Sequence, residues 1–275
     1  MLSYILLGLI QGITEFLPVS SSGHLILFKD FLGLNQDIVL DVSLHIATLL
    51  AVLFYYRKKL WSLTLSLLYQ ILLKLRVEPF ERFNLFSNPI DSSKDVKFIS
   101  FLILATIPAA LIGYLYDDFL ESLRYPVIVA SMLLLVAFLM LYDYLKTKTK
   151  HTNFNYKNVV IIGLAQAVAI IPGTSRSGIT ITIASLLGIK KENAADFTFM
   201  LSIPVISGAF LFKIADVSDF SAFFNLNVVL AFTVALISGY FSIGLLINIL
   251  KKYGFMPFIV YRILLALIVL IPLIL

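Results

Sequence analysis

The sequence contains no cysteine and few charged residues. The absence of cysteine excludes disulfide bonds and thiol catalysis. Charged residues fill 13% of the 275 positions and hydrophobic residues 60%, whereas a soluble globular domain is about 25% charged. Together with a mean hydropathy of +0.98, this composition excludes an ordinary soluble protein and indicates a polytopic membrane protein.

The positive net charge of +5 does not indicate a nucleic-acid partner, because the basic residues gather in short segments between apolar runs. Four such segments hold 16 of the 21 lysines and arginines: 57–97, 146–157, 190–191 and 251–252. The opposite connections are acidic and carry Asp117, Asp118, Glu121, Asp216 and Asp219. By the positive-inside rule, we expect the four basic segments in the cytoplasm and both termini outside.

The apolar runs predict an all-α integral membrane protein that forms one domain over residues 1–275. A spanning helix needs about 20 apolar residues. Six runs come close to that length: 40–56, 98–116, 125–145, 194–213, 226–250 and 256–275. Two further regions, 1–34 and 157–189, are broken midway by proline, glycine and serine. Their halves are too short to span, so we expect two re-entrant helix hairpins.

Two shorter stretches complete this interpretation. The apolar segment 60–73 is too short to span, and we expect an extension of the preceding helix or an interfacial helix. The first residues lack the basic start of a signal peptide, so we expect them in the mature fold.

The two broken regions are related by an internal repeat. At an offset of 155 residues, positions 8–34 show 9 identities with positions 163–189 without a gap, including matched Gln, Ser and Gly residues. The repeats are then about 1–145 and 157–275. Three spans separate the hairpins, and an odd number inverts the second half. We therefore expect an inverted-topology repeat whose hairpin tips meet near the membrane middle.

The tips carry polar residues within nearly pure hydrocarbon sequence. They are Gln11-Gly-Ile-Thr-Glu15-Phe-Leu-Pro-Val-Ser20-Ser-Ser22-Gly-His24 and Pro172-Gly-Thr-Ser175-Arg176-Ser177-Gly178. A charge at mid-bilayer depth costs at least about 2.5–3.5 kcal/mol, so it is kept mainly for function. A half-helix begins after each break, and its free N–H groups favour an anion. Arg176 adds a forked donor suited to phosphate oxygens.

The spacing of these residues suggests phosphoryl transfer. Ser21 and Arg176 occupy equivalent places in the repeat, so we expect them close together. His24 follows Ser21 by three residues, on the same helix face. A hydroxyl, an imidazole, a guanidinium and the Glu15 carboxylate together suggest phosphoryl transfer from a lipid-borne substrate.

Several of these residues also have a structural interpretation. Ser20, Ser22, Ser175 and Ser177 fit helix N-caps, and Gln11 fits a side chain that satisfies broken backbone. We expect Arg262, near the cytoplasmic end of the last helix, to snorkel toward water.

The motifs resemble those of the undecaprenyl-diphosphatase family, the bacitracin-resistance phosphatases. The family shows a Glu/Gln-x-x-x-Glu element, here Gln11 to Glu15, which runs into Phe-Leu-Pro-Val-Ser-Ser-Ser-Gly-His. It also shows Pro-Gly-x-Ser-Arg-Ser-Gly, here Pro172 to Gly178, with a lesser match at Pro257-Phe-Ile-Val-Tyr-Arg262. The resemblance runs from the first helix to the last. It implies hydrolysis of a C55 polyprenyl diphosphate to the monophosphate, which recycles the carrier lipid for cell-envelope glycan synthesis.

The resemblance also implies roles for individual residues. It implies four catalytic residues, Glu15, Ser21, His24 and Arg176. It also implies that six residues bind the substrate around its diphosphate: Gln11, Ser20, Ser22, Thr174, Ser175 and Ser177. A divalent cation, Mg²⁺ or Ca²⁺, is implied at Glu15 and Gln11, although many members have Glu where this chain has Gln11, a neutral ligand. The implied setting is the plasma membrane, with a polyprenyl diphosphate substrate, an extracytoplasmic opening, no nucleic acid and a possible homodimer.

Two competing functions come from other classes. Broken helices in inverted repeats are transporter anatomy, which makes a polyprenyl-phosphate flippase the alternative. A flippase needs Arg176 and the helix N-termini but not the group of Ser21, His24 and Glu15. Acid-phosphatase-like lipid phosphatases also use Ser-Gly-His and Ser-Arg, but this chain lacks their upstream Lys and second His. The sequence leaves open whether Ser21 or a water attacks phosphorus.

Overall fold

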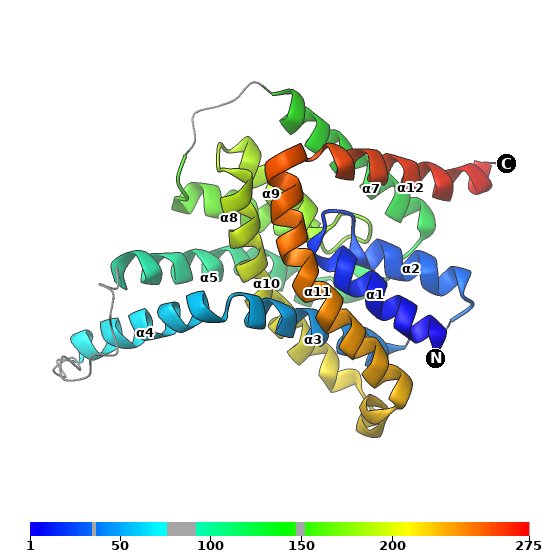
Figure 1. The fold of residues 1–275 in the computed structure, drawn as a ribbon, viewed down its shortest axis with the longest axis horizontal. Helices are drawn as coiled ribbons and strands as arrows, with labels where there is room; N and C mark the ends of the chain where they lie inside the picture. The colour runs from blue at the N-terminus through cyan, green and yellow to red at the C-terminus, as the bar shows by residue number, and fades with distance from the viewer. Residues whose placement is uncertain (35–36, 76–91, 147–151, 275) are drawn as a thin grey trace.

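The computed structural model describes residues 1–34, 37–75, 92–146 and 152–274, and within them the fold consists of helices joined by loops and turns, without strands (Figure 1). Parts of two predicted cytoplasmic segments, 76–91 and 147–151, lie outside these residues. The helices in chain order are α1 Leu2–Phe16, α2 Ser21–Phe31, α3 Ile38–Tyr55, α4 Arg57–Lys74, α5 Ser92–Leu115, α6 Asp117–Glu121, α7 Pro126–Leu145, α8 Tyr156–Val168, α9 Arg176–Leu186, α10 Lys191–Lys213, α11 Leu226–Tyr253 and α12 Met256–Ile274. Two short 3₁₀ turns, Ile214–Asp216 and Phe220–Phe224, connect α10 to α11.

Both broken regions form a helix, a loop and a second helix, as the sequence predicts. The first loop follows Phe16 and contains Pro18, which cannot donate a backbone hydrogen bond. The second loop follows Val168 and contains Gly173, which has φ +91. A Cβ at Gly173 would lie 2.3 Å from the carbonyl oxygen of Val129, so only glycine fits this close approach. In each region the two helices pack on one another, α1 on α2 and α8 on α9.

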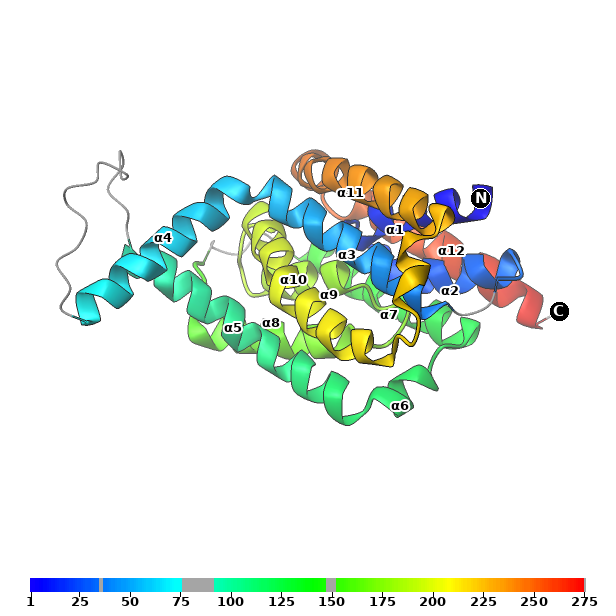
Figure 2. The same cartoon turned by 90° about the horizontal axis from the view of Figure 1, so that it is seen from below.

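Within the described ranges, five helices are long and apolar enough to cross a membrane, which supports an integral membrane protein. They are α3, α5, α7, α10 and α11. The sixth predicted span is α12, whose described stretch Met256–Ile271 counts among the shorter apolar helices. The segment 60–73 lies in α4, which follows α3 after the single residue Tyr56, and Figure 2 shows a sharp bend between the two helices.

Small residues bring helices of the two repeat halves into close contact. Gly8 and Gly12 of α1 face α11, where a Cβ on Gly8 would lie 2.3 Å from the Ala231 carbonyl oxygen. A Cβ on Gly12 would lie 2.0 Å from Ser238 Oγ. Gly163 of α8 faces α5 in the same way, and a Cβ on Gly163 would lie 2.8 Å from the Ala105 carbonyl oxygen. Such small-residue contacts are typical of helix packing in membranes.

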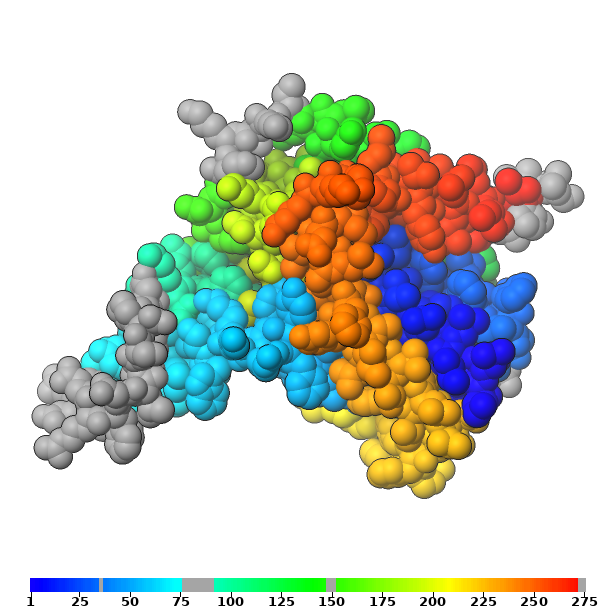
Figure 3. Space-filling view, viewed as in Figure 1, coloured from blue at the N-terminus to red at the C-terminus, as the bar shows by residue number. Residues whose placement is uncertain are grey.

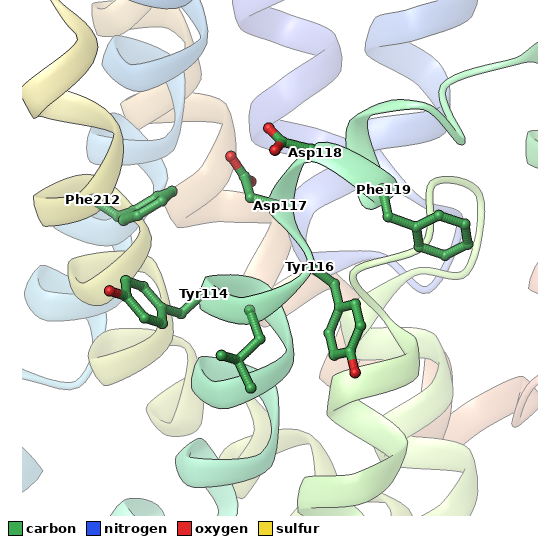
Figure 4. Close-up of a pocket in the computed structure, with 7 residues that line it drawn as sticks. Tyr114, Tyr116, Asp117, Asp118, Phe119 and Phe212 are labelled. Atoms are coloured by element: carbon green, nitrogen blue, oxygen red, sulfur yellow. The ribbon is translucent and has the colours of Figure 1, made fainter.

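The end of α5 forms a shallow acidic and aromatic surface with the end of α10 (Figure 4). A cavity of about 380 Å³ there is lined by Asp117, Asp118 and neighbouring aromatic residues. Lys213 Nζ lies 2.9 Å from a carboxylate oxygen of Asp117 and 2.9 Å from one of Glu121. None of the predicted site residues lines this cavity, so it is not the candidate site.

Candidate active site

The two hairpin loops touch, as the repeat predicts (Figure 1). Ser177 Oγ, from the second hairpin, donates to the Leu17 carbonyl oxygen in the first loop at 3.2 Å. Arg176 Nη2 donates to Glu15 Oε1 at 2.9 Å. Residues 160 positions apart in the chain therefore form one polar cluster between the tips.

Both tips use the same helix cap. Ser20 caps α2 and Ser175 caps α9, with Oγ accepting from Gly23 N at 3.3 Å and from Gly178 N at 3.1 Å. Their φ values are 77 and 70, and within the described residues they are the non-glycine positions with positive φ. Such backbone costs on the order of 1–3 kcal/mol and is concentrated at functional sites. The N-cap interpretation of Ser20 and Ser175 is therefore confirmed, and the strain marks the tips.

The other predicted tip residues support the loops. Ser22 Oγ lies 3.3 Å from Ser20 Oγ, and Ser177 Oγ lies 3.3 Å from Ser175 Oγ. Thr174 is fully buried and donates to the Ile171 carbonyl oxygen at 2.7 Å. The hydroxyl of Thr174 thus closes its own loop.

Glu15 stands at the centre of the cluster. Its carboxylate is 8% exposed and accepts from three side chains. Oε1 accepts from Arg176, while Oε2 accepts from Ser21 Oγ at 2.6 Å and from Gln11 Nε2 at 3.1 Å. Ser21 and Arg176 therefore lie close together, as predicted, because both donate to the carboxylate of Glu15. The buried ion pair is sustained by these extra hydrogen bonds, because a bare pair rarely repays its desolvation.

Two buried polar atoms of the cluster have no hydrogen-bond partner among the described residues. They are Arg176 Nη1, a donor, and Gln11 Oε1, an acceptor. An unpaired buried polar group costs about 1–3 kcal/mol, so each one calls for an explanation. A phosphate oxygen would satisfy the guanidinium donor with a charge-assisted hydrogen bond. The cluster is therefore incomplete in a way that an oxyanion completes.

His24 does not join Ser21 or Glu15, contrary to the prediction from its spacing. Its Nδ1 lies 2.7 Å from the Ser20 carbonyl oxygen and its Nε2 lies 2.6 Å from Tyr261 Oη. Helical side chains lean toward the helix N-terminus, which directs this ring to the carbonyl four residues earlier. The ring also stacks on Tyr261, with 5.6 Å between centroids. His24 thus contacts α12 through Tyr261, whereas the Ser21 hydroxyl donates to Glu15.

The prediction that Arg262 snorkels is wrong. Its side chain is fully buried and donates five hydrogen bonds of 3.0–3.1 Å to backbone carbonyl oxygens. The acceptors belong to α7 and to both hairpin loops: Leu133, Met132, Pro18, Gly173 and Thr174. Nε and Nη1 each donate to one carbonyl oxygen, and Nη2 shares its two N–H groups among three. The planar guanidinium can join three segments in this way, and no other side chain offers as many donors. Arg262 holds the two tips together, and its place in the Pro257–Arg262 motif was the only sequence signal for this.

The donor set at Glu15 matches one mode of divalent-cation binding. The described residues contain no group of three His, Asp or Glu side chains that could enclose a metal. Glu15 offers a single carboxylate, and the unpartnered Gln11 Oε1 offers one neutral oxygen. Mg²⁺ is commonly bound by one or two carboxylates together with substrate phosphates. The two side chains fit a cation that arrives with a diphosphate, and they do not fit a resident metal centre.

The comparisons with known proteins cover nearly the whole chain. The family model described as bacitracin resistance protein BacA matches residues 4–268. An undecaprenyl-diphosphatase of Elusimicrobium minutum is 39% identical over 269 residues, which are 97% of this chain and 96% of that protein. Undecaprenyl-diphosphatases of Colwellia psychrerythraea and Alcanivorax borkumensis are each 41% identical, covering 96% and 95% of both chains respectively.

Proposed function

The chain belongs to the bacitracin resistance protein BacA family, and from that premise we propose that it hydrolyses undecaprenyl diphosphate at the Glu15 cluster. The products are undecaprenyl phosphate and inorganic phosphate, which returns the carrier lipid to cell-envelope glycan synthesis. One observation supports this site above the others. A buried guanidinium nitrogen, Arg176 Nη1, has no partner among the described residues, beside a serine bound to a carboxylate.

Binding of the diphosphate rests on fixed donors. Arg176 contributes the guanidinium, and α2 and α9 direct their N-termini at the same region between the tips. The first-turn N–H groups of a helix and the positive end of its dipole favour phosphate oxygens. Because these donors are held by caps and by Arg262, they need little reorganisation as charge develops in the transition state.

We assign the attack on the terminal phosphorus to Ser21. Its Oγ forms a bond to phosphorus, while its proton passes to Glu15 Oε2, 2.6 Å away. The bond from phosphorus to the bridging oxygen breaks, and undecaprenyl phosphate leaves. Water then attacks the phosphoserine and the bond from phosphorus to Ser21 Oγ breaks. Glu15 returns its proton to Ser21 Oγ, and the protons of the attacking water leave with inorganic phosphate. The alternative is direct attack by water, with Ser21 only donating a hydrogen bond.

Ser21→Ala separates these two routes. If Ser21 is the nucleophile, the variant should fall to the background rate, and a phosphoserine at residue 21 should be trapped in the native chain by rapid acid quench. Ser131→Ala is the control, because this hydroxyl is exposed and donates to the Val127 carbonyl oxygen in its own helix α7, away from Glu15. Multiple turnovers by Ser21→Ala at a percent or more of the native rate would assign the attack to water instead.

We propose that a divalent cation accompanies the substrate. Gln11 Oε1 and the Glu15 carboxylate are the side-chain oxygens that would hold Mg²⁺ or Ca²⁺. When bound, such a cation neutralises negative charge on the diphosphate oxygens.

The direct test of the function is phosphate release by the purified chain. We expect inorganic phosphate from undecaprenyl diphosphate and from farnesyl diphosphate, and no release from the monophosphates. EDTA should lower the rate, and added Mg²⁺ or Ca²⁺ should restore it. Undiminished release in EDTA would remove the cation from the proposal, whereas no release under any condition would remove the function.

The flippase alternative is not favoured. The curated relatives bear the name of a diphosphatase, and Ser21 and Glu15, which lipid transport does not need, meet in one hydrogen bond.

We further propose six spans, with α12 as the sixth, and two re-entrant hairpins in the plasma membrane. The charge pattern supports placing both termini on the extracytoplasmic side, and we propose that the active site opens on that side too. A homodimer remains a prediction.

Because the chain has no cysteine, a single introduced thiol tests this topology. We expect Asp219→Cys, in the α10–α11 connection, to react with an impermeant maleimide in intact cells. Lys146→Cys, at the end of α7, should react only after the cells are opened. Both native side chains are exposed, so accessibility within the protein does not bias the pair. External labelling of Lys146→Cys would reverse the orientation.

A further inference from the structure

Three of the four basic segments meet around one cavity that is separate from the hairpin tips. The cavity has a volume of about 1130 Å³ and lies among the end of α7, the α9–α10 connection and the α11–α12 connection. Figure 3 shows the end of α11 and the start of α12, in orange to red, against the end of α7 in green. The lysines on its wall are Lys146, Lys190, Lys191 and Lys252, and no residue of the Glu15 cluster lines it.

The electrostatic balance of the wall favours an anion. Four lysines face two carboxylates, those of Asp143 and Glu192. Lys191 is occupied, because its Nζ lies 2.9 Å from Asp143 Oδ2. Lys190 and Lys252 are exposed. Lys190 is also the N-cap residue of α10 and makes no side-chain cap, which leaves first-turn N–H groups of α10 at this wall.

The opposite wall is apolar and continues into an exposed stripe. Met256 and Val260 of α12 line the cavity and are 39% and 49% exposed. Leu264, Leu267 and Ile271 continue the stripe at helical spacing, and all three are exposed. A ligand with a charged head and a long apolar tail would contact both walls.

We propose that this cavity binds the headgroup of an anionic glycerophospholipid of the cytoplasmic leaflet. The phosphodiester lies at Lys190 and Lys252, and an acyl chain follows the α12 stripe. Basic pockets between membrane helices on the cytoplasmic side are suited to such headgroups. A free phosphate shares the charge but makes no use of the apolar wall.

Native mass spectrometry of the full chain, titrated with phosphatidylglycerol or phosphatidylcholine, tests this proposal. We expect tighter binding of phosphatidylglycerol. Removing one lysine charge near a membrane surface weakens such binding about fivefold, so Lys190→Gln with Lys252→Gln should weaken it about 25-fold. The matched control is Lys58→Gln with Lys251→Gln, which removes two exposed cytoplasmic-segment lysines that do not line the cavity. Phosphate release from farnesyl diphosphate in detergent should stay unchanged in both double variants.

The possible results separate the sources of the anion. Equal binding of the two lipids, or the same loss in the control variant, would overturn the proposal. Inorganic phosphate that displaces phosphatidylglycerol at comparable concentration would assign the cavity to a free anion and overturn the lipid assignment. Lipid selectivity that survives in a chain inactive toward diphosphates would support this site independently of the proposed function.

Discussion

Arg176→Ala should lose nearly all turnover of polyprenyl diphosphate while the protein stays folded. Removing one charge-assisted contact to a transition-state oxyanion typically costs about 10²–10³ in rate. In the proposed site Arg176 Nη1, which has no partner among the described residues, makes such a contact, and Nη2 pairs with Glu15 at 2.9 Å. Its loss leaves a buried carboxylate unpaired, so we expect at least the upper end of that range. The measurement is kcat for phosphate release from farnesyl diphosphate.

Arg176→Lys should not rescue the activity. Lysine keeps the charge but lacks the planar fork that serves Glu15 and a phosphate oxygen together. Arg57→Ala is the control, because this guanidinium is exposed and donates only to the Phe54 carbonyl oxygen in its own turn. Near-native turnover by Arg176→Ala would exclude the Glu15 cluster as the active site.

Arg262→Ala should lower both the stability and the turnover of the protein. It deletes five hydrogen bonds that join α7 to the two loops. Each buried carbonyl left without a partner typically costs about 1–3 kcal/mol. Thermal unfolding in detergent should therefore show a clearly lower midpoint. Lys213→Ala provides the control. It removes two partly exposed ion pairs between α10 and α6, each worth about 0–1 kcal/mol.

Arg262→Lys tests positioning apart from stability. Lysine can reach some of the five carbonyls with three donors, so we expect partial recovery of the unfolding midpoint. The tips would no longer be fixed relative to one another, and kcat should stay low while KM changes little. A fully active Arg262→Lys enzyme would show that a buried charge, and not the joining of the loops, is what the site needs.

The sequence allowed prediction of the polar tips and of their meeting, because both depend on the repeat. Gln11, Ser20 and Gly23 recur at one fixed offset, and proline and glycine interrupt each apolar run. A duplicated, inverted unit brings equivalent positions together without any knowledge of side-chain contacts. The proximity of Ser21 and Arg176 follows from that symmetry, whereas their shared contact with Glu15 does not, because the equivalent position in the second repeat is Ile170.

The side-chain partners could not be predicted in the same way. Arg262 lies only six residues after the start of α12, a rise of roughly 9 Å, which a snorkelling side chain can cover. Its burial depends on hydrogen bonds to the carbonyl oxygens of Gly173 and Pro18. The order of residues along the chain does not show that these two loops lie beside α12. His24 likewise shares a face with Ser21 in sequence terms, but its partner Tyr261 comes from 237 residues away.

The contact between α1 and α11 has a consequence for how the chain is made. Gly8 and Gly12 lie so close to α11 that a Cβ on either residue would overlap Ala231 or Ser238. At synthesis rates of about 5–20 residues per second, α11 leaves the ribosome roughly 10–45 s after α1. During that interval the glycine face of α1 has only lipid or the insertion machinery beside it. The first hairpin can therefore take its final place only near the end of synthesis, once the last third of the chain has entered the membrane.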